Sequence, residues 1–243
     1  MEIQTLLEKT RVMHQLLQKA ASNALDFETI AGELKDVIGC NVYIVGKKGV
    51  LLGQSCMEAD SLFGPEDLEN KQFSEECTQW IFGFTQTEIN LQRENHYIIL
   101  APIISSGDRL GTLVYTRKGQ PFNPAEVILS EYGSSVAGMQ IMKIVNQRIE
   151  NEARKKTVVQ LALEVLSYSE LEAVKYIFNE IEGNEGFLVA SKLAEQYKLT
   201  RSVIVNALRK LESAGVIDAR SLGMKGTYIK VLNDYLYEEL AQV

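Results

Sequence analysis

The sequence predicts an α+β protein in which two folded regions are joined by one long helix. Three observations support this fold class. Strand-like runs are grouped between residues 41 and 116, helical periodicity persists over 124–166, and a helix-turn-helix pattern with two short strands occupies 190–232. The chain has 243 residues, and 46% of them are hydrophobic, which is enough to bury a core.

The N-terminal region predicts two helices followed by an antiparallel sheet. Apolar residues recur at helical spacing over 2–21 and 27–38. Strand-like runs at 41–45 and 50–53, and at 97–104 and 110–116, flank segments with turn chemistry and predict two hairpins. The stretch 57–93 is less periodic and predicts short helices plus a further strand. This arrangement is typical of GAF or PAS sensor domains, although a fold alone does not establish a ligand.

A strong helix start precedes the long helical stretch. Asn123 predicts an N-cap, Pro124 occupies the first helical position, and Glu126 is the N3 residue of a capping box. A continuous helix over 124–166 would be about 65 Å long. Its middle, 146–156, is almost wholly polar, so we expect it to bridge two domains, either as a transmitter of motion or as a passive spacer. Ser169 and Glu172 predict a capping box for the next helix.

The region 190–232 predicts a winged helix-turn-helix. A helix at 190–198, a turn at 199–202 and a second helix at 203–214 are followed by strands at 216–217 and 227–232, around a tight loop at 223–226. This order presents the second helix to the major groove of DNA. The expected buried face of that helix consists of Ile204, Ala207, Leu208 and Leu211. The candidate DNA-binding residues are Ser191, Thr200, Arg201, Ser202, Val205, Asn206, Arg209, Met224, Lys225 and Gly226.

The charge distribution favours nucleic-acid binding by this region alone. The chain carries a net charge of -7, but residues 191–230 contain eight lysines or arginines against three acids, a local charge of +5. Affinity for phosphate depends on local charge, because each neutralised phosphate releases counterions. Arginine pairs bidentately with guanine and asparagine with adenine, so the exposed face has the side chains that base recognition needs.

The motifs of other function classes are absent from the sequence. The cysteines Cys40, Cys56 and Cys77 are scattered, and we expect reduced thiols rather than disulfides or metal ligands. His14 and His96 are the only histidines, and no metal-binding, GxSxG or Walker A motif occurs, so we expect neither a metal site nor an enzyme. No apolar run approaches the roughly 20 residues of a membrane span, and no signal peptide is evident, which predicts a cytoplasmic protein.

Several segments closely resemble the CodY family of global transcriptional regulators from low-GC Gram-positive bacteria. The resemblance is densest from Leu166 onward, in 166–173, 183–186, 202–217 and 220–232, and it extends to 7–11, 36–38 and 131–133. It implies a GAF-type effector-sensing domain over 1–138, a linker helix over 139–166 and a winged helix-turn-helix domain over 167–243. It also implies a homodimer or tetramer that represses nutrient-responsive genes by binding double-stranded operators, expected to be AT-rich and roughly palindromic.

The resemblance implies two effectors that raise DNA affinity, namely GTP and a branched-chain amino acid, isoleucine above all. The candidate GTP residues are Gly46, Lys47, Lys48, Glu152 and Lys156; the hairpin lysines replace family arginines and lack their bidentate fork. The candidate amino-acid residues are Phe73, Ser74, Cys77 and Arg93. A family pocket arginine falls near Phe63, and Arg93 is the candidate replacement for binding a ligand carboxylate. The alternative is an effector-independent DNA-binding repressor whose GAF domain only dimerises the chain or senses a different metabolite.

Overall fold

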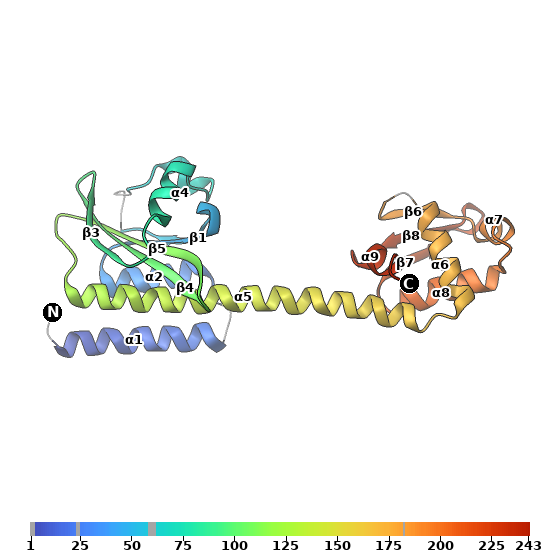
Figure 1. Ribbon diagram of the computed structural model, residues 1–243, viewed down its shortest axis with the longest axis horizontal. Helices are drawn as coiled ribbons and strands as arrows, with labels where there is room; N and C mark the ends of the chain where they lie inside the picture. The colour runs from blue at the N-terminus through green and yellow to red at the C-terminus, as the bar shows by residue number, and fades with distance from the viewer. Residues whose placement is uncertain (1–2, 23–24, 58–61, 182) are drawn as a thin grey trace. The chain divides into compact units, whose positions relative to one another are not determined.

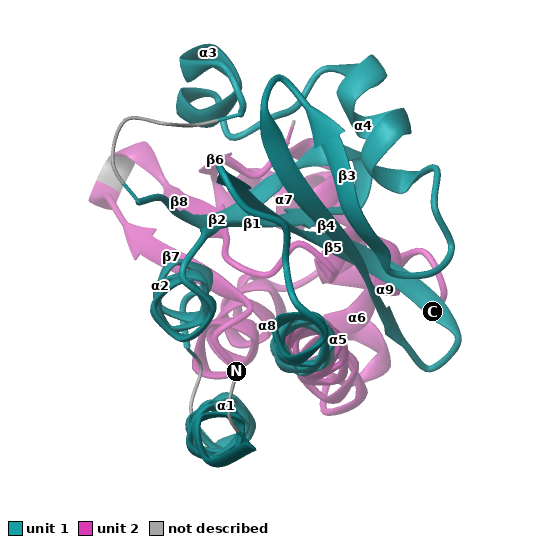
Figure 2. Ribbon diagram, turned by 90° about the vertical axis from the view of Figure 1, so that its left-hand side faces the viewer, with its two compact units in different colours: residues 1–146 teal, residues 147–243 magenta. Residues whose placement is uncertain are grey.

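The computed structural model describes residues 3–22, 25–57, 62–181 and 183–243. The chain forms two compact units, Met1–Asn146 and Gln147–Val243 (Figures 1 and 2). Each unit has its own hydrophobic core. The predicted fold class is confirmed, since an antiparallel sheet with helices, a long helix and a winged helix-turn-helix domain follow one another along the chain.

The first unit is built around a five-stranded sheet. Its strands lie in the order β2-β1-β5-β4-β3, with every neighbouring pair antiparallel, so both predicted hairpins are present. The elements are α1 (Ile3–Ser22), α2 (Phe27–Ile38), β1 (Asn41–Gly46), the 3-10 turn η1 (Lys47–Gly49), β2 (Leu51–Ser55), α3 (Pro65–Glu69), α4 (Glu75–Phe82), β3 (Glu88–Arg93), β4 (His96–Ser105), β5 (Asp108–Lys118) and α5 (Pro124–Glu164).

Both faces of this sheet are covered, which follows from the alternation of side chains along each strand. In β1, Val42 and Ile44 join a core with α1, α2 and α5, whereas Tyr43 and Val45 join a second core that includes Ile81 of α4. Figure 2 shows α1, α2 and α5 on one side of the sheet and α3 and α4 on the other. The unit is therefore a three-layer domain with the sheet in the middle.

Helix α5 is continuous over 41 residues. It begins as predicted, because the Asn123 side chain accepts hydrogen bonds from the N–H groups of Ala125 (3.0 Å) and Glu126 (3.1 Å). Gly133 is required within it for packing, since a Cβ there would lie 2.4 Å from the Tyr115 hydroxyl. The predicted polar middle is exposed, as the burial of residues 144–155 shows. Beyond it, Val159 enters the core of the second unit.

The second unit contains a helical core and a three-stranded sheet in the order β6-β8-β7. Its elements, after the end of α5, are α6 (Tyr168–Glu180), β6 (Glu185–Leu188), α7 (Ala190–Gln196), α8 (Arg201–Ser213), β7 (Ile217–Ser221), the 3-10 turn η2 (Gly223–Lys225), β8 (Thr227–Val231) and α9 (Leu236–Leu240). Strand β6 was not predicted, because the glycines at 183 and 186 suggested only a break. It pairs along its whole length with β8.

The predicted capping box of α6 was placed two residues too late. Ser167 is the N-cap, and its hydroxyl accepts from the N–H of Glu170, while the Glu170 carboxylate accepts from the N–H of Ser167 at 2.8 Å. Ser169 and Glu172 have the same sequence spacing, but both lie inside the helix. The correct pair is selected by tertiary contacts, since Glu170 is buried and also accepts a hydrogen bond from Lys210.

The three thiols are free: Cys40 is buried, and Cys56 and Cys77 are half-buried. Burial raises the pKa of the Cys40 and Cys77 thiols. A search of the helices in the described ranges finds none with the length and apolar character that crossing a membrane requires.

One nearly buried ion pair joins β5 to the start of α5 and generates a first prediction. Arg117 donates to both carboxylate oxygens of Glu126, at 2.8 and 2.7 Å, and their side chains are only 11% and 9% exposed. Burial alone would raise the pKa of Glu126, but the hydrogen bonds from Arg117 and from the N–H of Asn123 outweigh it, and the pKa is lowered.

We therefore expect Glu126→Gln to lower the free energy of unfolding of the first unit by about 3 kcal/mol at neutral pH, because Arg117 loses its charged partner. Because the pKa of Glu126 is lowered in the folded state, its ionised carboxylate stabilises the fold at pH values above the ordinary carboxyl pKa. This stabilisation is lost as the pH falls through the lowered pKa. The difference between wild type and variant should thus shrink on acidification. Urea unfolding followed by the single tryptophan, Trp80, measures it, with the exposed Glu131→Gln as control. Equal stability of both variants at neutral pH would contradict the prediction.

Candidate nucleic-acid interface and effector pocket

Helix α8 has one buried and one exposed face. Ile204, Ala207, Leu208 and Leu211 are buried in the core of the second unit, as the sequence periodicity predicted. The opposite face exposes Arg201, Ser202, Asn206 and Arg209, with Val205 partly exposed among them. The five side chains proposed to contact DNA therefore share one accessible surface.

The turn before α8 fixes where that surface begins. The Thr200 side chain caps the helix by accepting from the N–H of Val203, and its hydroxyl lies 3.0 Å from that of Ser202. The N–H of Leu199 donates to the carbonyl of Ala194 at 2.9 Å, which closes the end of α7. Helix α8 consequently starts at Arg201, two residues before the predicted start. Ser191 is exposed in the first turn of α7.

The wing is a tight loop between β7 and β8. The N–H of Leu222 donates to the carbonyl of Gly226 at 2.8 Å, and η2 occupies the loop between them. Gly226 has φ 97° and ψ -155°, a conformation that is essentially restricted to glycine. Lys225 is exposed, whereas the side chain of Met224 lies outside the described residues. The loop therefore offers one cation and an accessible backbone.

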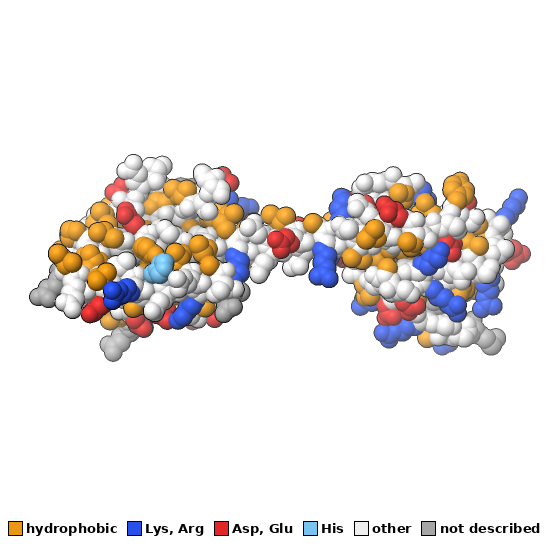
Figure 3. Space-filling model, turned by 90° about the horizontal axis from the view of Figure 1, so that it is seen from below, with side chains coloured by type: hydrophobic (Ala, Val, Ile, Leu, Met, Phe, Trp, Pro, Cys, Tyr) orange, Lys and Arg blue, Asp and Glu red, His pale blue; other side chains and the backbone are white. Residues whose placement is uncertain are grey.

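The second unit carries basic side chains on the face shown in Figure 3. Within this unit, the segment 191–230 has a local charge of +5, which contrasts with the net charge of -7 for the chain. Some of this charge is internally compensated, since Arg220 pairs with Asp218 at 2.8 Å. Arg201, Arg209 and Lys225 have no ion pair among the described residues, so their charges are available to phosphates and bases.

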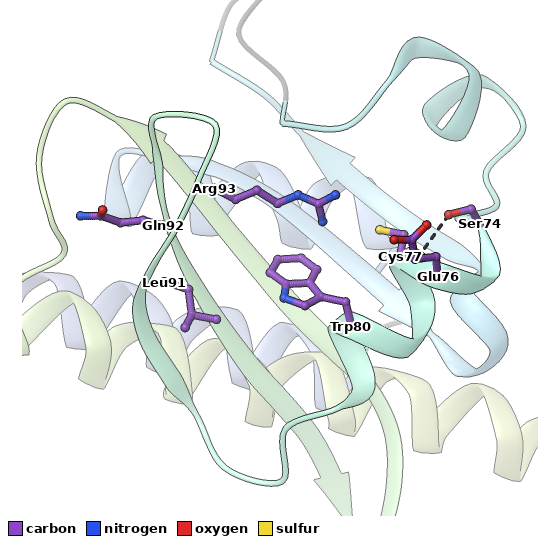
Figure 4. Close-up of a pocket in the computed structure, with 7 residues that line it drawn as sticks. All are labelled: Ser74, Glu76, Cys77, Trp80, Leu91, Gln92 and Arg93. Carbon is purple, nitrogen blue, oxygen red and sulfur yellow. Dashed lines mark hydrogen bonds between the residues drawn. The ribbon is translucent and has the colours of Figure 1, made fainter.

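Three of the four candidate amino-acid residues line one open cavity of the first unit (Figure 4). Its volume is about 380 Å³, and Ser74, Cys77 and Arg93 contribute to its walls. The Arg93 guanidinium lies over the Trp80 ring, 5.1 Å from its centroid, and forms no ion pair within the part of the chain that the structure describes. Leu91 and Trp80 supply apolar wall, so the cavity combines an available cation with an apolar surface.

The sheet face behind this cavity is filled by the protein itself. Phe63 packs edge-on against Tyr43, with ring centroids 4.8 Å apart, and its ring lies 4.6 Å from that of Phe73. All three are buried in one cluster. Phe73, the fourth candidate amino-acid residue, thus belongs to the core and does not line the cavity of Arg93. It lines a neighbouring cavity of about 440 Å³ beside Lys48.

The candidate GTP residues fall in different units. Lys47 and Lys48 are exposed on η1, where Gln72 donates to the carbonyl of Lys48 at 2.7 Å, and Gly46 is buried at the end of β1. Glu152 is exposed on α5 and pairs with Arg148 at 3.3 Å.

Lys156, the remaining member of this set, is already paired within the second unit. Its ammonium lies 2.9 Å from Glu238 and 3.1 Å from Glu239 of α9. The hydrogen bonds to these two carboxylates raise the pKa of Lys156. An anionic ligand at Lys156 would therefore compete with two carboxylates of the chain itself.

Sequence reasoning did not single out Trp80, Glu76 or Leu91 as pocket residues. Trp80 lies three residues after Cys77 on α4, so helical spacing alone could have placed the two on one face. Its proximity to Arg93 depends on how β3 packs beside α4, for which the sequence has no local signal. Glu238 and Glu239 were missed because the short helix α9 was not predicted.

Comparisons with known proteins agree over nearly the whole chain. The family described as "CodY GAF-like domain" matches residues 5–165, and the "CodY helix-turn-helix domain" matches residues 184–243. The chain is 47% identical to the global transcriptional regulator CodY of Lysinibacillus sphaericus, covering 98% of each protein. It is 48% identical to the regulator of the same name from Bacillus velezensis, covering 97% of each.

A solved structure also resembles the first part of the chain. The cofactor-binding GAF domain of the nutrient sensor CodY from Clostridium difficile is 33% identical, with a TM-score of 0.43. The similarity covers 58% of this chain and 99% of that domain.

The wing glycine generates a second prediction. A Cβ on Gly226 would lie 2.4 Å from the carbonyl oxygen of Leu188, and its backbone conformation is itself unfavourable for any other residue. We expect Gly226→Ala to destabilise the second unit by about 2–3 kcal/mol, as strained backbone and a steric clash combine. Gly223→Ala is the matched control, because Gly223 also has a positive φ but a Cβ there meets nothing within 4 Å. Thermal unfolding followed by circular dichroism compares them, and equal effects would contradict the prediction.

Proposed function

The chain belongs to the CodY family of global transcriptional regulators, and from this premise we propose that it represses nutrient-responsive genes by reading operator DNA with helix α8. The observation that carries the proposal is the exposed face of α8, which places Arg201, Asn206 and Arg209 on one surface. The capped start of the helix and its buried apolar face hold that surface rigidly. Preorganised side chains read base edges at a smaller entropic cost.

Each element of the interface has a distinct role in this proposal. Arg201 and Asn206 read bases in the major groove, with Val205 available to a thymine methyl group. Ser191, Thr200 and Ser202 donate to phosphates, and Arg209 contributes to both kinds of contact. The wing residues Met224, Lys225 and Gly226 contact the backbone or the minor groove. The operator is double-stranded and AT-rich. It is roughly palindromic because a homodimer, or a tetramer built from two dimers, presents two such helices.

We propose an amino-acid effector site in the cavity of Arg93. Its guanidinium binds the ligand carboxylate, and Trp80 and Leu91 contact the apolar side chain of isoleucine or another branched-chain amino acid. A cavity of about 380 Å³ is in the range of small-molecule sites. Support comes from Arg93 itself, which lines this cavity together with Ser74 and Cys77 and is the candidate replacement for the family arginine that falls near Phe63.

GTP is the second proposed effector, with Lys47 and Lys48 of η1 binding its triphosphate; Glu152 and Lys156 of α5 are the other candidate residues. The exposure of both hairpin lysines supports this assignment. The pairing of Lys156 with Glu238 and Glu239 predicts weak nucleotide binding, because the phosphates must displace these carboxylates. We propose a regulator without catalytic activity, acting in the cytoplasm.

One observation favours a second candidate function, a repressor that needs no effector. Phe63 fills the apolar sheet face between Tyr43 and Phe73, so the first unit has a complete core without any ligand. In this alternative the GAF domain dimerises the chain or senses another metabolite.

The deciding experiment measures binding to an operator that the wild-type protein itself selects from a random DNA library. Titrations at fixed salt contain isoleucine, valine, leucine or GTP, singly and together. We expect tighter operator binding with isoleucine, and Arg93→Ala should abolish this response without changing the effector-free affinity. By linkage, the effector must also bind more tightly in the presence of operator. Strong binding that ignores all four compounds would support the effector-independent alternative.

Substitutions on α8 and in the wing should have different effects. We expect Arg201→Ala and Asn206→Ala each to reduce the preference for operator over random DNA by about 1–3 kcal/mol, because each loses a bidentate base contact. Lys225→Ala should weaken binding to all sequences and reduce the salt slope by about 1, because it loses a phosphate contact. Salt-dependent titrations with operator and random duplexes separate the two effects. Unchanged preference in Arg201→Ala would show that another surface reads the bases.

A further inference from the structure

Lys210 lies on the flank of α8, between the buried face and the face proposed to contact DNA. Lys210 follows the exposed Arg209 by one residue and the buried Leu208 by two. Because an α-helix has 3.6 residues per turn, this spacing places it outside the exposed face and outside the buried face. Its side chain points toward the joint between α5 and α6. The ammonium donates to the Glu170 carboxylate at 2.7 Å and to the carbonyl of Val165 at 3.1 Å.

The two acceptors belong to the two sides of that joint. Val165 directly follows α5, and carbonyl groups at a helix C-terminus lack intrahelical donors and favour a cation. Glu170 belongs to the first turn of α6, where its carboxylate also accepts from the N–H of Ser167 in the capping box. One ammonium group therefore connects the end of the long helix, the start of the next helix and the recognition helix.

Glu170 makes this connection specific. Its side chain is 9% exposed, whereas that of Lys210 is 41% exposed, so the carboxylate is the buried partner. A buried carboxylate without a cation is strongly unfavourable, and among the described residues no cationic side chain other than Lys210 pairs with it. The hydrogen bond from Lys210 and that from Ser167 lower the pKa of Glu170, so it is charged at neutral pH.

We propose that Lys210 is a positioning residue that sets the orientation of α8 against the α5–α6 joint and thereby couples DNA reading to the end of the long helix. This inference rests on the proposed DNA-reading role of α8. Base contacts read the sequence and need the helix held in one geometry, whereas phosphate contacts carry no sequence information. Loss of the Lys210 contacts should therefore reduce sequence preference more than total affinity.

The test compares Lys210→Met with wild type on the selected operator and on random duplex DNA at fixed salt. We expect Lys210→Met to lose about tenfold of the operator preference, similar to the loss of one base contact, with unchanged affinity for random DNA. Lys210→Arg should retain most of the preference, because it keeps a cation at the joint. Lys175→Met, which removes a charge from α6 without touching the joint, is the control and should behave as wild type.

A second variant keeps the test decisive if Lys210→Met fails to fold. Glu170→Gln retains a capping-box residue at N3 and weakens only the pairing with Lys210, so it should show the same loss of preference. Combined with Lys210→Met, it should add little further loss, because both remove one interaction.

Hydrogen exchange supplies a readout that a purely stabilising contact would not change. In wild type, operator binding should slow amide exchange in residues 163–167 as well as in α8. In Lys210→Arg the slowing should persist at both places, whereas in Glu170→Gln it should persist only in α8.

Absence of operator preference in wild type would refute the proposed function. Preference and exchange equal to wild type in both Lys210→Met and Glu170→Gln would refute the positioning role alone. A parallel loss on operator and random DNA would identify Lys210 as a phosphate contact instead.

Discussion

A single helix belongs to two hydrophobic cores, and the rest of the structure depends on this constraint. Helix α5 contributes Leu129 and Val136 to the core of the first unit, and Val159 and Leu163 to that of the second. Protein interiors are close-packed, so neither end of the helix can turn about its axis without repacking its neighbours. The polar segment between the two ends contributes no side chain to either core, and its backbone hydrogen bonds and the Arg148–Glu152 ion pair maintain its continuity.

In the first unit, the side chains that complete the core are not the ones that could bind a charged ligand. The sheet face that could enclose a ligand is closed by Phe63 and Phe73, which contain no group to pair with a buried carboxylate. A charged effector must therefore bind outside this apolar layer, where Arg93 is accessible to solvent and Trp80 still offers an apolar wall. A site at the edge of this complete core is not needed for folding.

Local patterns were sufficient to predict most of the fold. The helix-turn-helix was predictable because Ile204, Leu208 and Leu211 recur at helical spacing, and the start of α5 because Asn123 caps its own helix. Features that depend on distant partners were missed or misplaced. The capping box at Ser167 and Glu170 has the same sequence spacing as Ser169 and Glu172, and it is distinguished by the burial of Glu170 and its hydrogen bond from Lys210, forty residues later. Strand β6 exists because β8 pairs with it. The contact between Arg93 and Trp80 likewise depends on tertiary packing.

The two sources of DNA affinity have different structural requirements. Electrostatic attraction to DNA follows from the basic segment 191–230. The remaining chain is acidic, so this attraction is confined to the surface of that segment. Sequence preference requires more, because a base edge is reached only if α8 is held at the right angle. That angle is set on the side of the helix that faces the protein, by the core and by the joint at Val165 and Glu170. In the proposed DNA-reading role of α8, residues that never touch DNA would therefore determine how well this regulator distinguishes one sequence from another.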